Sequence, residues 1–458
     1  MAQQYTVKRF MCQNGVGGCI QQCALIGYVD ANGKLVKVEG NPNSPINQGL
    51  ICADRVPRIP DILYSEWQLK HPLKRTGARG ENKWQRITWD QALTEIANKL
   101  LELKAKYGPE TLALFEGTYR SDIYWARSRC LNLFGNPSNI GDPGTICFTH
   151  YVALHHAMLG DPLPSSDLYE SNCIVNGGRD FNASFPLSSW FVQARLKRKD
   201  KPPLKLIVLD PRATDAVKDA DIWMQPRPGT DAVIFLSWLN VIIQEKLYDR
   251  EFVEKWTNAP LLVRATDKPR ILRESDIKPG GSNEKFAVWN TATSSVAIWK
   301  PDAFEYEPKD AKPALEGSYG VQLADGSTAE CKTVWQLIAD RVKEYTPEEA
   351  ERISWVPAPK IRESARMYAT NRPGTINWTV PQDQSGWNAI TNELVKCILR
   401  AVTGNLDVTG GEPLRGLGPR IKGKMAVRDS MLQMEEALPA ALRRKQLGHR
   451  PGHPEPMV

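Results

Sequence analysis

No stretch of this sequence is apolar over a length that would cross a bilayer. The longest apolar run, AVIFLSWLNVII at residues 232–243, is only long enough for a buried helix. The first ten residues, MAQQYTVKRF, contain neither the apolar core of an export signal nor paired arginines. We therefore expect no membrane span and a cytoplasmic location.

The sequence also lacks a strong excess of charge of one sign. Its 458 residues carry a formal net charge of +7, and basic residues are interspersed with acidic ones. A nucleic-acid-binding surface gathers basic and aromatic side chains into one patch, whereas the densest basic run here, at residues 197–205, is typical of a solvated face. The charge pattern disfavours a nucleic-acid partner. The composition, 41% hydrophobic and 24% charged, is that of a globular protein with several domains.

Cysteine is sparse. The nine cysteines in the chain are too few for a disulfide-based scaffold. Four of the nine nevertheless lie near the start, at Cys12, Cys19, Cys23 and Cys52, in the pattern Cys-x6-Cys-x3-Cys-x28-Cys. Three clustered thiolates and one distant thiolate can enclose a cubane iron–sulfur cluster. A zinc knot is an alternative, although zinc sites usually show two short paired spacings. Two further alternatives for these four cysteines are a disulfide framework and a chance distribution.

The segment between Cys23 and Cys52 predicts how the fourth thiolate returns to the other three. Two alternating apolar runs flank Asn32-Gly33, a dipeptide typical of a tight hairpin turn. A stretch rich in Gly, Asn and Pro then follows at residues 40–49. This pattern indicates a short β-meander, which can bring Cys52 back beside the first three cysteines.

Predicted strands and helices alternate beyond residue 60. Thr88 is the residue type of an N-cap, and apolar residues at helical spacing follow it as far as Leu103, before the strand TLALFEG. The segments SNCIVNGG and LKLIVLD are typical of buried strands, and residues 232–243 of a long helix. Strands that alternate with helices favour an α/β fold with a parallel sheet covered on both faces.

The loops after these strands carry residues typical of a nucleotide site. Gly177 and Gly178 follow one strand, where backbone amides can receive a pyrophosphate, although the full GxGxxG pattern is absent. Asp210 ends the next strand, where an acid can accept hydrogen bonds from ribose hydroxyls. Asp231 ends a further loop, RPGTD at residues 227–231. The alternative for each acid alone is that it caps the following helix. Three such loops together favour a nucleotide-bearing ligand.

Three segments carry a resemblance to a known family. The cluster cysteines followed by HPLKRTGARGENKWQRITWDQAL, then LKLIVLDPRATDAVKDADIWMQPRPGTDA, then VTGNLDVTGG, resemble the catalytic subunits of the molybdopterin oxidoreductase (dimethyl sulfoxide reductase) superfamily. The order and the residues of these motifs are most similar to those of the branch that contains tungsten-dependent acetylene hydratase. The resemblance runs from about residue 10 to residue 447, with an interruption at about 265–335. It implies molybdenum or tungsten held by two pyranopterin guanine dinucleotides, next to a [4Fe-4S] cluster.

The resemblance implies roles for individual residues. Cys147, in GDPGTICFTH, would be the side-chain ligand of the molybdenum or tungsten. His150, one turn later, is a candidate proton donor, with a core or surface histidine as the alternative. The [4Fe-4S] ligands would be Cys12, Cys19, Cys23 and Cys52. The cofactor-binding residues would be Gly177, Gly178, Asp210, Arg212, Gly229 and Asp231, then Gly404 and Asn405 in a later pterin-side turn, and Arg55 in place of a lysine that commonly lies between cluster and pterin.

The sequence departs from the family's pattern at points that bear on function. Six residues separate Cys12 from Cys19, where two or three are usual. Ile20 stands where the hydratase has its acid–base aspartate, which disfavours water addition to acetylene. Catalytic subunits of this family are also considerably longer. We therefore expect either a separate chain that supplies the C-terminal domain or an inactive, cluster-binding fragment.

The sequence thus predicts an α/β protein with a small N-terminal β-rich iron–sulfur domain followed by doubly wound, Rossmann-like parallel-sheet domains. The predicted function is oxo transfer or two-electron redox chemistry on a small molecule, with an electron-transfer protein as partner and a non-redox hydratase or hydroxyl transferase as the alternative. The predicted domains are residues 1–60 for the cluster, 61–145 with 340–458 for a first, incomplete α/β domain, 146–264 for the guanine dinucleotide, and 265–339 for a β-rich insertion.

Overall fold

The computed structural model of the chain divides into two compact units. The first holds residues 1–149, 181–190 and 417–458, and the second holds residues 150–180 and 191–416. The residues that the structure describes are 5–12, 23–44, 47–52, 56–115, 130–136, 140–141, 149–160, 166–180, 194–195, 198, 201–266, 269–384, 386–414, 420–421 and 424–425.

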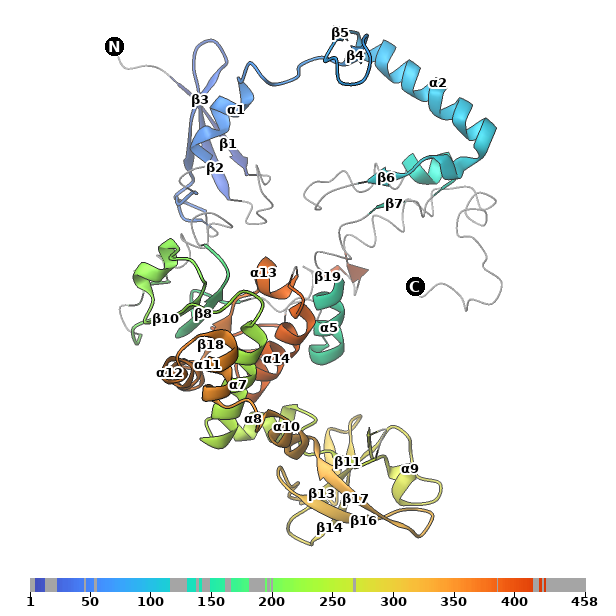
Figure 1. The fold of residues 1–458 in the computed structure, drawn as a ribbon, viewed down its shortest axis with the longest axis vertical. Coiled ribbons are helices and arrows are strands. Elements are labelled where there is room, and N and C mark those ends of the chain that lie inside the picture. The colour runs from blue at the N-terminus through green and yellow to red at the C-terminus, as the bar shows by residue number, and fades with distance from the viewer. Residues whose placement is uncertain are drawn as a thin grey trace. The chain divides into compact units, whose positions relative to one another are not determined.

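The first unit opens with a three-stranded antiparallel sheet (Figure 1). At its second turn, the Asp30 carboxylate accepts hydrogen bonds from the backbone amides of Asn32 and Lys34, both at 2.9 Å. This Asx-type contact fixes the turn that the Asn-Gly dipeptide predicts. The predicted meander is confirmed, with strands β1 (Thr6–Met11), β2 (Ala24–Val29) and β3 (Leu35–Gly40), followed by helix α1 (Ile59–Leu63).

A long helix, α2 (Trp89–Tyr107), forms most of the regular structure in the remainder of the first unit. Thr88 caps it as predicted, because its hydroxyl accepts a hydrogen bond from the Gln91 amide at 3.2 Å. None of the residues in α2 is buried. The short strands of this unit are β4 (Leu73–Arg75) paired with β5 (Trp84–Arg86), β6 (Leu114–Phe115) parallel to β7 (Ile140–Gly141), and β19 (Arg420–Ile421) paired with β20 (Lys424–Met425).

The second unit is built on a parallel sheet. Its four strands lie in the order β10-β9-β8-β18, and every neighbouring pair is parallel. The chain runs outward from β8 to β9 and β10, and it returns much later as β18 on the other side of β8. Every residue of β8 is buried, which is why this segment shows no apolar–polar alternation. The strands are β8 (Cys173–Gly177), β9 (Lys205–Leu209), β10 (Ile222–Met224) and β18 (Gly374–Ile376).

Helix α7 (Asp231–Gln244) forms the centre of the hydrophobic core of this unit. It has eleven buried residues, as expected for the apolar run at 232–243. The same core contains side chains from the parallel sheet and from five later helices, α8 (Arg250–Trp256), α10 (Val334–Val342), α11 (Pro347–Ser354), α12 (Ala358–Thr370) and α14 (Ala389–Val402). Two further helices, α5 (Thr149–Leu159) and α13 (Val380–Asp383), contribute no described residue to it.

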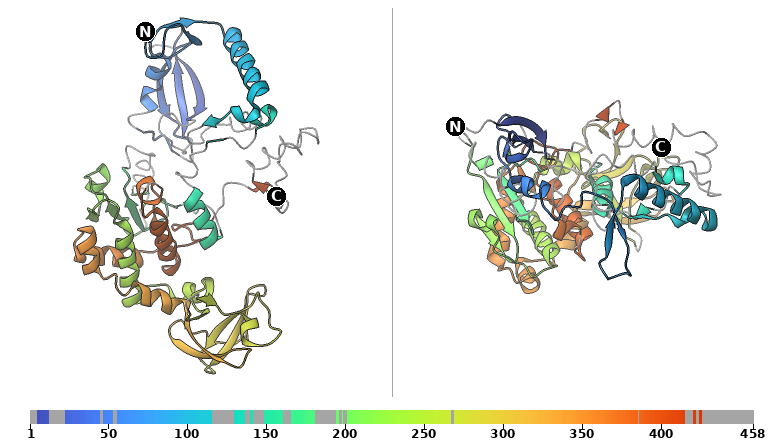
Figure 2. Two further views of the ribbon diagram at one scale, coloured as in Figure 1. Left: turned by 45° about the vertical axis from the view of Figure 1, so that its right-hand side comes forward. Right: turned by 90° about the horizontal axis from the view of Figure 1, so that it is seen from above.

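Residues 262–333 form a β-rich segment of the second unit with a small core of its own. In Figures 1 and 2 this segment, coloured yellow, extends away from the helices of the same unit. It contains one sheet in the order β12-β11-β17-β16 and another in the order β13-β14-β15. Its elements are β11 (Leu262–Arg264), β12 (Arg270–Ile271), α9 (Glu274–Ile277), β13 (Phe286–Asn290), β14 (Ser295–Lys300), β15 (Glu305–Glu307), β16 (Ser318–Gln322) and β17 (Thr328–Thr333).

The structure differs from the prediction that residues 340–458 join residues 61–145 in one domain. Residues 340–416 lie in the second unit, because β18 pairs with β8 and α14 packs against α7. A strand of three residues carries too short a pattern to reveal its partner from the sequence. The segment therefore completes the nucleotide-type sheet rather than a separate domain.

The observed fold is α/β, as predicted, with a parallel sheet covered by helices in the second unit and a small β-rich sheet at the start of the first. Within the described residues, no helix is both long enough and apolar enough to span a membrane.

Truncation of Trp238 tests the core of the second unit. This side chain is fully buried in α7, with ring centroids 5.8 Å from Tyr368 and 5.5 Å from Phe235. We expect Trp238→Ala to lower the free energy of unfolding by about 3–5 kcal/mol through lost burial and a residual cavity. Urea denaturation followed by circular dichroism measures the change. Trp256→Ala, at a side chain that is 59% exposed, is the control and should cost much less.

Candidate functional site

The carboxyl ends of the four parallel strands lie at one edge of the sheet in the second unit, and the region outside this edge is here named the crevice. The chain leaves β8 toward β9 on one side, while β18 lies on the other side, so the strand order reverses between β8 and β18. In open α/β sheets, ligands bind at such a reversal, outside the carboxyl ends of the strands. The predicted loops after β8, β9 and β10 all meet at this edge, and the loop after β18 joins them.

Gly177 and Gly178 bring the backbone of the β8 turn close to α13. A Cβ added to Gly177 would overlap the side-chain amide of Gln382. Gly178 has φ of +60°, and its amide donates a hydrogen bond to the Leu209 carbonyl at 2.7 Å. Gly178 therefore requires glycine for its backbone conformation, whereas a side chain at Gly177 would displace the end of the Gln382 side chain.

Asp231 joins the start of α7 to α13. It is the first residue of α7, and the N-cap residue, Thr230, makes no side-chain capping bond. One Asp231 carboxylate oxygen accepts a hydrogen bond from Gln382 Nε2 at 2.7 Å. Burial raises the pKa of Asp231, against the lowering effects of Gln382 and Lys396. An acid in the first turn also suits the helix N-terminus, so the position of Asp231 fits both a ligand contact and support of the helix.

Asp210 orders the turn after β9. Its Oδ1 accepts a hydrogen bond from the Arg212 amide at 2.9 Å, and its side chain is almost completely buried. Its carbonyl accepts a hydrogen bond from Trp223 Nε1 at 2.9 Å. The Arg212 side chain is 72% exposed, with Nε 3.6 Å from Asp210 Oδ1, so a cation lies at the mouth of the crevice.

The loop after β10 reaches the loop between α13 and α14. Gly229 has φ of +83°, and its carbonyl accepts a hydrogen bond from Asn388 Nδ2 at 3.0 Å. This contact and the packing of Gly177 on Gln382 hold the loops of three strands together.

Several buried polar atoms at this edge lack a hydrogen-bond partner among the residues that the structure describes. Such atoms are costly in a protein interior, because each has lost its water without a replacement. They include both donors and acceptors, a mixture that suits a polar ligand such as a nucleotide. The atoms are Asn176 Oδ1, Asp210 Oδ2, Asn377 Nδ2, Thr379 Oγ1 and Gln382 Oε1.

A buried ion pair lies behind the Gln382 loop. Lys396 Nζ lies 2.8 Å from both carboxylate oxygens of Asp383, and neither side chain is exposed. Burial raises the pKa of Asp383, while Lys396 opposes the rise. The backbone amide of Thr379 also donates to Asp383 at 2.7 Å. The pair therefore fixes the conformation of the loop that carries Gln382.

Sequence reasoning missed Gln382, Asp383 and Lys396. Gln382 and Asp231 are far apart in the sequence, and no local pattern joins them. The sequence could have indicated that Lys396 is buried, because Lys396 lies on the apolar face of α14, three residues after Glu393 and three before Leu399. A charged residue on such a face indicates a buried partner.

The first unit brings three of the four predicted cluster ligands together. Cys23 is buried in a small core, and the half-buried Cys12 and Cys52 pack against that core. The Cys12 amide donates a hydrogen bond to the Cys23 carbonyl at 2.8 Å. The meander therefore places Cys52 against the same small core as the other two.

Other predicted site residues fall outside what the structure describes. Cys19, Arg55 and Cys147 lie among the residues that are not described, and of His150 only the backbone is described, at the start of α5. Among the histidines near it, His155 is a core histidine and His156 is exposed.

Gly404 and Asn405 lie at the other end of β18 from the crevice. Asn405 is fully buried, and its Oδ1 accepts a hydrogen bond from the amide of Gly374, the first residue of β18, at 2.8 Å. Its Nδ2 donates to Thr403 Oγ1 at 2.8 Å. The Asn405 side chain therefore holds the first residue of β18, and the cofactor-binding role of this turn stays a prediction.

A family model described as molybdopterin oxidoreductase matches residues 69–414. The chain belongs to the molybdopterin oxidoreductase family. Sequence identity is 28% to dopamine dehydroxylase of Eggerthella lenta, over 94% of this chain and 50% of that protein. It is 31% to perchlorate reductase subunit alpha of Dechloromonas aromatica, over 69% of this chain and 36% of that protein. The solved structure of acetylene hydratase from Pelobacter acetylenicus matches with a TM-score of 0.61 and 29% identity, over 89% of this chain and 44% of that chain.

Membership of the molybdopterin oxidoreductase family implies a molybdopterin cofactor with molybdenum or tungsten. The similar proteins are enzymes that include both reductases and a hydratase. The chain spans about half the length of the curated relatives it matches first.

Gly177→Ala tests the close approach in the crevice. The added methyl group would push Gln382 away from Asp231, and we expect a loss of about 1–3 kcal/mol in the free energy of unfolding from this overpacking. The double variant Gly177→Ala/Gln382→Ala should be no less stable than Gln382→Ala alone, because the clash has gone. Strictly additive losses in urea denaturation would contradict this account.

Proposed function

We propose that the crevice at the carboxyl end of the sheet binds the guanine dinucleotide part of a molybdopterin cofactor. The observation that carries this proposal is the group of buried polar atoms at the point where the strand order reverses, which have no partner among the described residues. The polar edge of a guanine base offers donors to Asp231 and acceptors or donors to Gln382. Asp210 Oδ2 is an acceptor for ribose hydroxyls.

The glycine turns and Arg212 would receive the pyrophosphate. Gly229 has open space where a side chain would stand, so a phosphate oxygen can approach the backbone of this turn closely. The exposed guanidinium of Arg212 adds a cation that can form two parallel hydrogen bonds to phosphate. The chain's own share of the function is thus to bind and orient the nucleotide tail.

We further propose that Cys147 is the side-chain ligand of molybdenum or tungsten and that His150 donates a proton near it. A thiolate suits a soft, sulfur-rich metal site. Cys12, Cys19, Cys23 and Cys52 would hold a [4Fe-4S] cluster, which the gathering of three of them supports. When bound, the two groups would supply two-electron or oxo-transfer chemistry on a small molecule and single-electron transfer to a partner protein.

Non-redox hydration remains the second candidate function, because acetylene hydratase is among the similar proteins. Ile20 provides no acid where the hydratase pattern has one, so we favour redox chemistry. An inactive cluster-binding fragment is the third candidate. A cytoplasmic location remains a prediction from the sequence.

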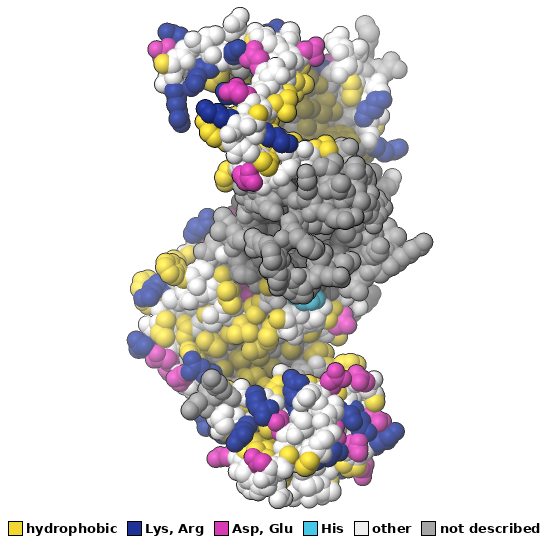
Figure 3. All heavy atoms as spheres, turned by 90° about the vertical axis from the view of Figure 1, so that its right-hand side faces the viewer, with side chains coloured by type: hydrophobic (Ala, Val, Ile, Leu, Met, Phe, Trp, Pro, Cys, Tyr) yellow, Lys and Arg dark blue, Asp and Glu magenta, His cyan; other side chains and the backbone are white. Residues whose placement is uncertain are grey.

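We propose that a second polypeptide segment, equivalent to the second half of the relatives, covers α2. Trp89, Leu93 and Ile96 share one face of this helix and are 63%, 59% and 58% exposed. Parallel strands are normally buried on both faces, yet Phe115 in β6 is 83% exposed. Hydrophobic side chains are visible at the surface of both units in Figure 3. An amphipathic helix without a covered face is an interface that needs a partner.

Cofactor analysis of anaerobically purified protein tests the main proposal. We expect about four iron atoms, one molybdenum or tungsten atom and about two GMP released by acid hydrolysis per chain. Asp231→Ala should lower the GMP content severalfold, whereas Asp325→Ala, on an exposed turn of the β-rich segment, should leave it unchanged. Zinc without iron, molybdenum or tungsten would refute the redox function.

Substitution on α2 tests the proposed covering segment. Leu93→Lys with Ile96→Lys places two charges on the apolar face, and we expect it to release the covering segment, because burying an unpaired charge is costly. The measurement is hydrogen exchange of α2 in the natively purified assembly, where the wild-type helix should exchange at least about tenfold more slowly than in the variant. Lys99→Glu, at an exposed charged position of the same helix, is the control. Equal exchange in the wild type and the double variant would show that this face is uncovered.

A further inference from the structure

Helix α5 is attached to the second unit through a buried polar contact. Among residues 153–159, for which the structure describes burial in this helix, only His155 is buried. Its Nε2 contacts the carboxylate of Glu393 on α14. Helices on the surface of globular proteins are usually held by an apolar stripe instead.

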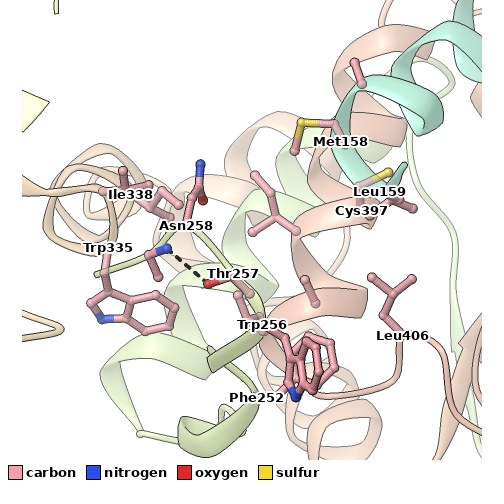
Figure 4. Close-up of a pocket in the computed structure, with 16 residues that line it drawn as sticks. Met158, Leu159, Phe252, Trp256, Thr257, Asn258, Trp335, Ile338, Cys397 and Leu406 are labelled. Carbon is pink, nitrogen blue, oxygen red and sulfur yellow. Dashed lines mark hydrogen bonds between the residues drawn. The ribbon is translucent and has the colours of Figure 1, made fainter. Parts of the chain in front are cut away.

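A cavity of about 460 Å³ lies beside the end of α5, where apolar packing would be expected. Met158 and Leu159 of α5 line it together with Cys397 of α14, and Trp335 and Ile338 line it from another side (Figure 4). Atoms that face a void gain no dispersion energy from that side. The last turn of α5 therefore contributes little apolar packing, and the contact through His155 gains in importance.

Glu393 connects α5 to the edge of the crevice. Its carboxylate also contacts the guanidinium of Arg400, about two helical turns further along the same face of α14. Arg400 Nη2 donates a hydrogen bond to the carbonyl of Ile376, the last residue of β18, at 3.0 Å. Glu412 completes the network, because it accepts a hydrogen bond from the Ile376 amide at 2.8 Å and lies 3.4 Å from Arg400 Nε.

The charges in this network favour a close contact of Glu393 with Arg400 and His155. Burial raises the pKa of Glu393, but Arg400 and His155 outweigh it and leave that pKa below the ordinary value. Glu393 and Glu412 likewise raise the pKa of Arg400 in spite of its burial. Removing one partner would leave a buried charge without compensation, which is strongly unfavourable.

A metal ion in place of these ion pairs is disfavoured. His155, Glu393 and Cys397 have ligand atoms within 4.8 Å of one another, a donor set that a transition metal accepts. However, the guanidinium of Arg400 contacts Glu393 and lies 3.8 Å from the Cys397 sulfur. A cation at this point would meet a fixed positive charge at close range. The cluster therefore acts as a clamp made of hydrogen bonds and ion pairs.

We infer that Glu393 is a positioning residue, which fixes α5 to the crevice edge at β18 through His155 on one side and Arg400 on the other. Cys147, the proposed metal ligand, lies two residues before α5 in the sequence, and His150 is in its first turn. The catalytic meaning of the clamp rests on the proposed function, whereas the clamp itself stands on contacts between described residues.

Hydrogen exchange of the full-length protein tests the clamp directly. Glu393→Gln keeps the shape of the side chain and removes its charge, and His155→Gln changes the other partner. We expect each variant to raise the exchange of α5 amides by about tenfold or more, while β9 and α7 amides change by less than about twofold. The double variant should equal the stronger single variant, because both act through one contact.

Ile361→Ala is the matched control, because Ile361 is fully buried in α12 and belongs to the core around α7. It should lower overall stability and leave α5 exchange relative to the other elements unchanged. Unchanged α5 exchange in both Glu393→Gln and His155→Gln, or a uniform rise in all elements, would overturn the inference.

A second readout separates this inference from the proposed function. In holoenzyme purified with molybdate, Glu393→Gln should alter the electron paramagnetic resonance spectrum of the metal while its GMP content stays at the wild-type level. If both variants show faster exchange of α5 but the wild-type protein binds no molybdenum or tungsten, the proposed function is refuted and the clamp is kept. Metal-loaded wild type with an unaffected α5 in both variants would refute the clamp and keep the proposed function.

Discussion

The pairing of β18 with β8 is the constraint on which the rest of the second unit depends. The two strands are about 200 residues apart in the sequence, yet they lie in parallel register with Gly374 opposite Cys173. This pairing creates the reversal of strand order and hence the crevice. It also brings Gln382 to Gly177 and to Asp231, so the polar lining exists only because the distant strand returns. Asn405 and Arg400 hold the two ends of β18, which explains why polar side chains are buried around so short a strand.

The two units differ in how far their surfaces are closed. In the second unit, α7 has eleven buried residues, and the loops at the carboxyl ends of the strands are hydrogen-bonded to one another. In the first unit, α2 has no buried residue and β6 pairs with β7 alone among the described strands. Loops that are already ordered lower the conformational cost of binding a ligand. Under the proposed function, cofactor binding in the second unit and the covering of α2 in the first would therefore be separate events.

Local signals in the sequence were sufficient for the elements and for part of the site. Thr88 predicted the start of α2, the Asn-Gly turn predicted the meander, and the apolar run at 232–243 predicted α7, because each depends on neighbouring residues only. The strands β8, β9 and β10 were predicted for the same reason, with the acids and glycines at their ends. These signals are properties of the backbone and of burial within one element.

Contacts between distant segments were beyond such reasoning. The prediction that residues 340–458 join residues 61–145 did not include the pairing of β18 with β8, because β18 has three residues and no alternation. The turn at Gly404 and Asn405 has the composition of a binding loop, but its polar atoms are used within the fold. The five polar atoms without described partners, one of them on Gln382, come together only when the distant segments assemble at the sheet edge. The family resemblance indicated which residues bind the cofactor, whereas the packing of distant segments determines which side chains lie at the sheet edge.

Helix α14 carries three buried charges on its inner side, and each holds a different element near the crevice. Glu393 contacts α5, Lys396 fixes Asp383 in α13, and Arg400 binds the end of β18. Apolar residues of similar size would often be as stable or more so, since desolvation of charges is expensive. Apolar contacts are, however, non-directional, and they would allow the three elements to slide against α14. Ion pairs and hydrogen bonds specify both partner and orientation, which is what a site built from three separate segments requires.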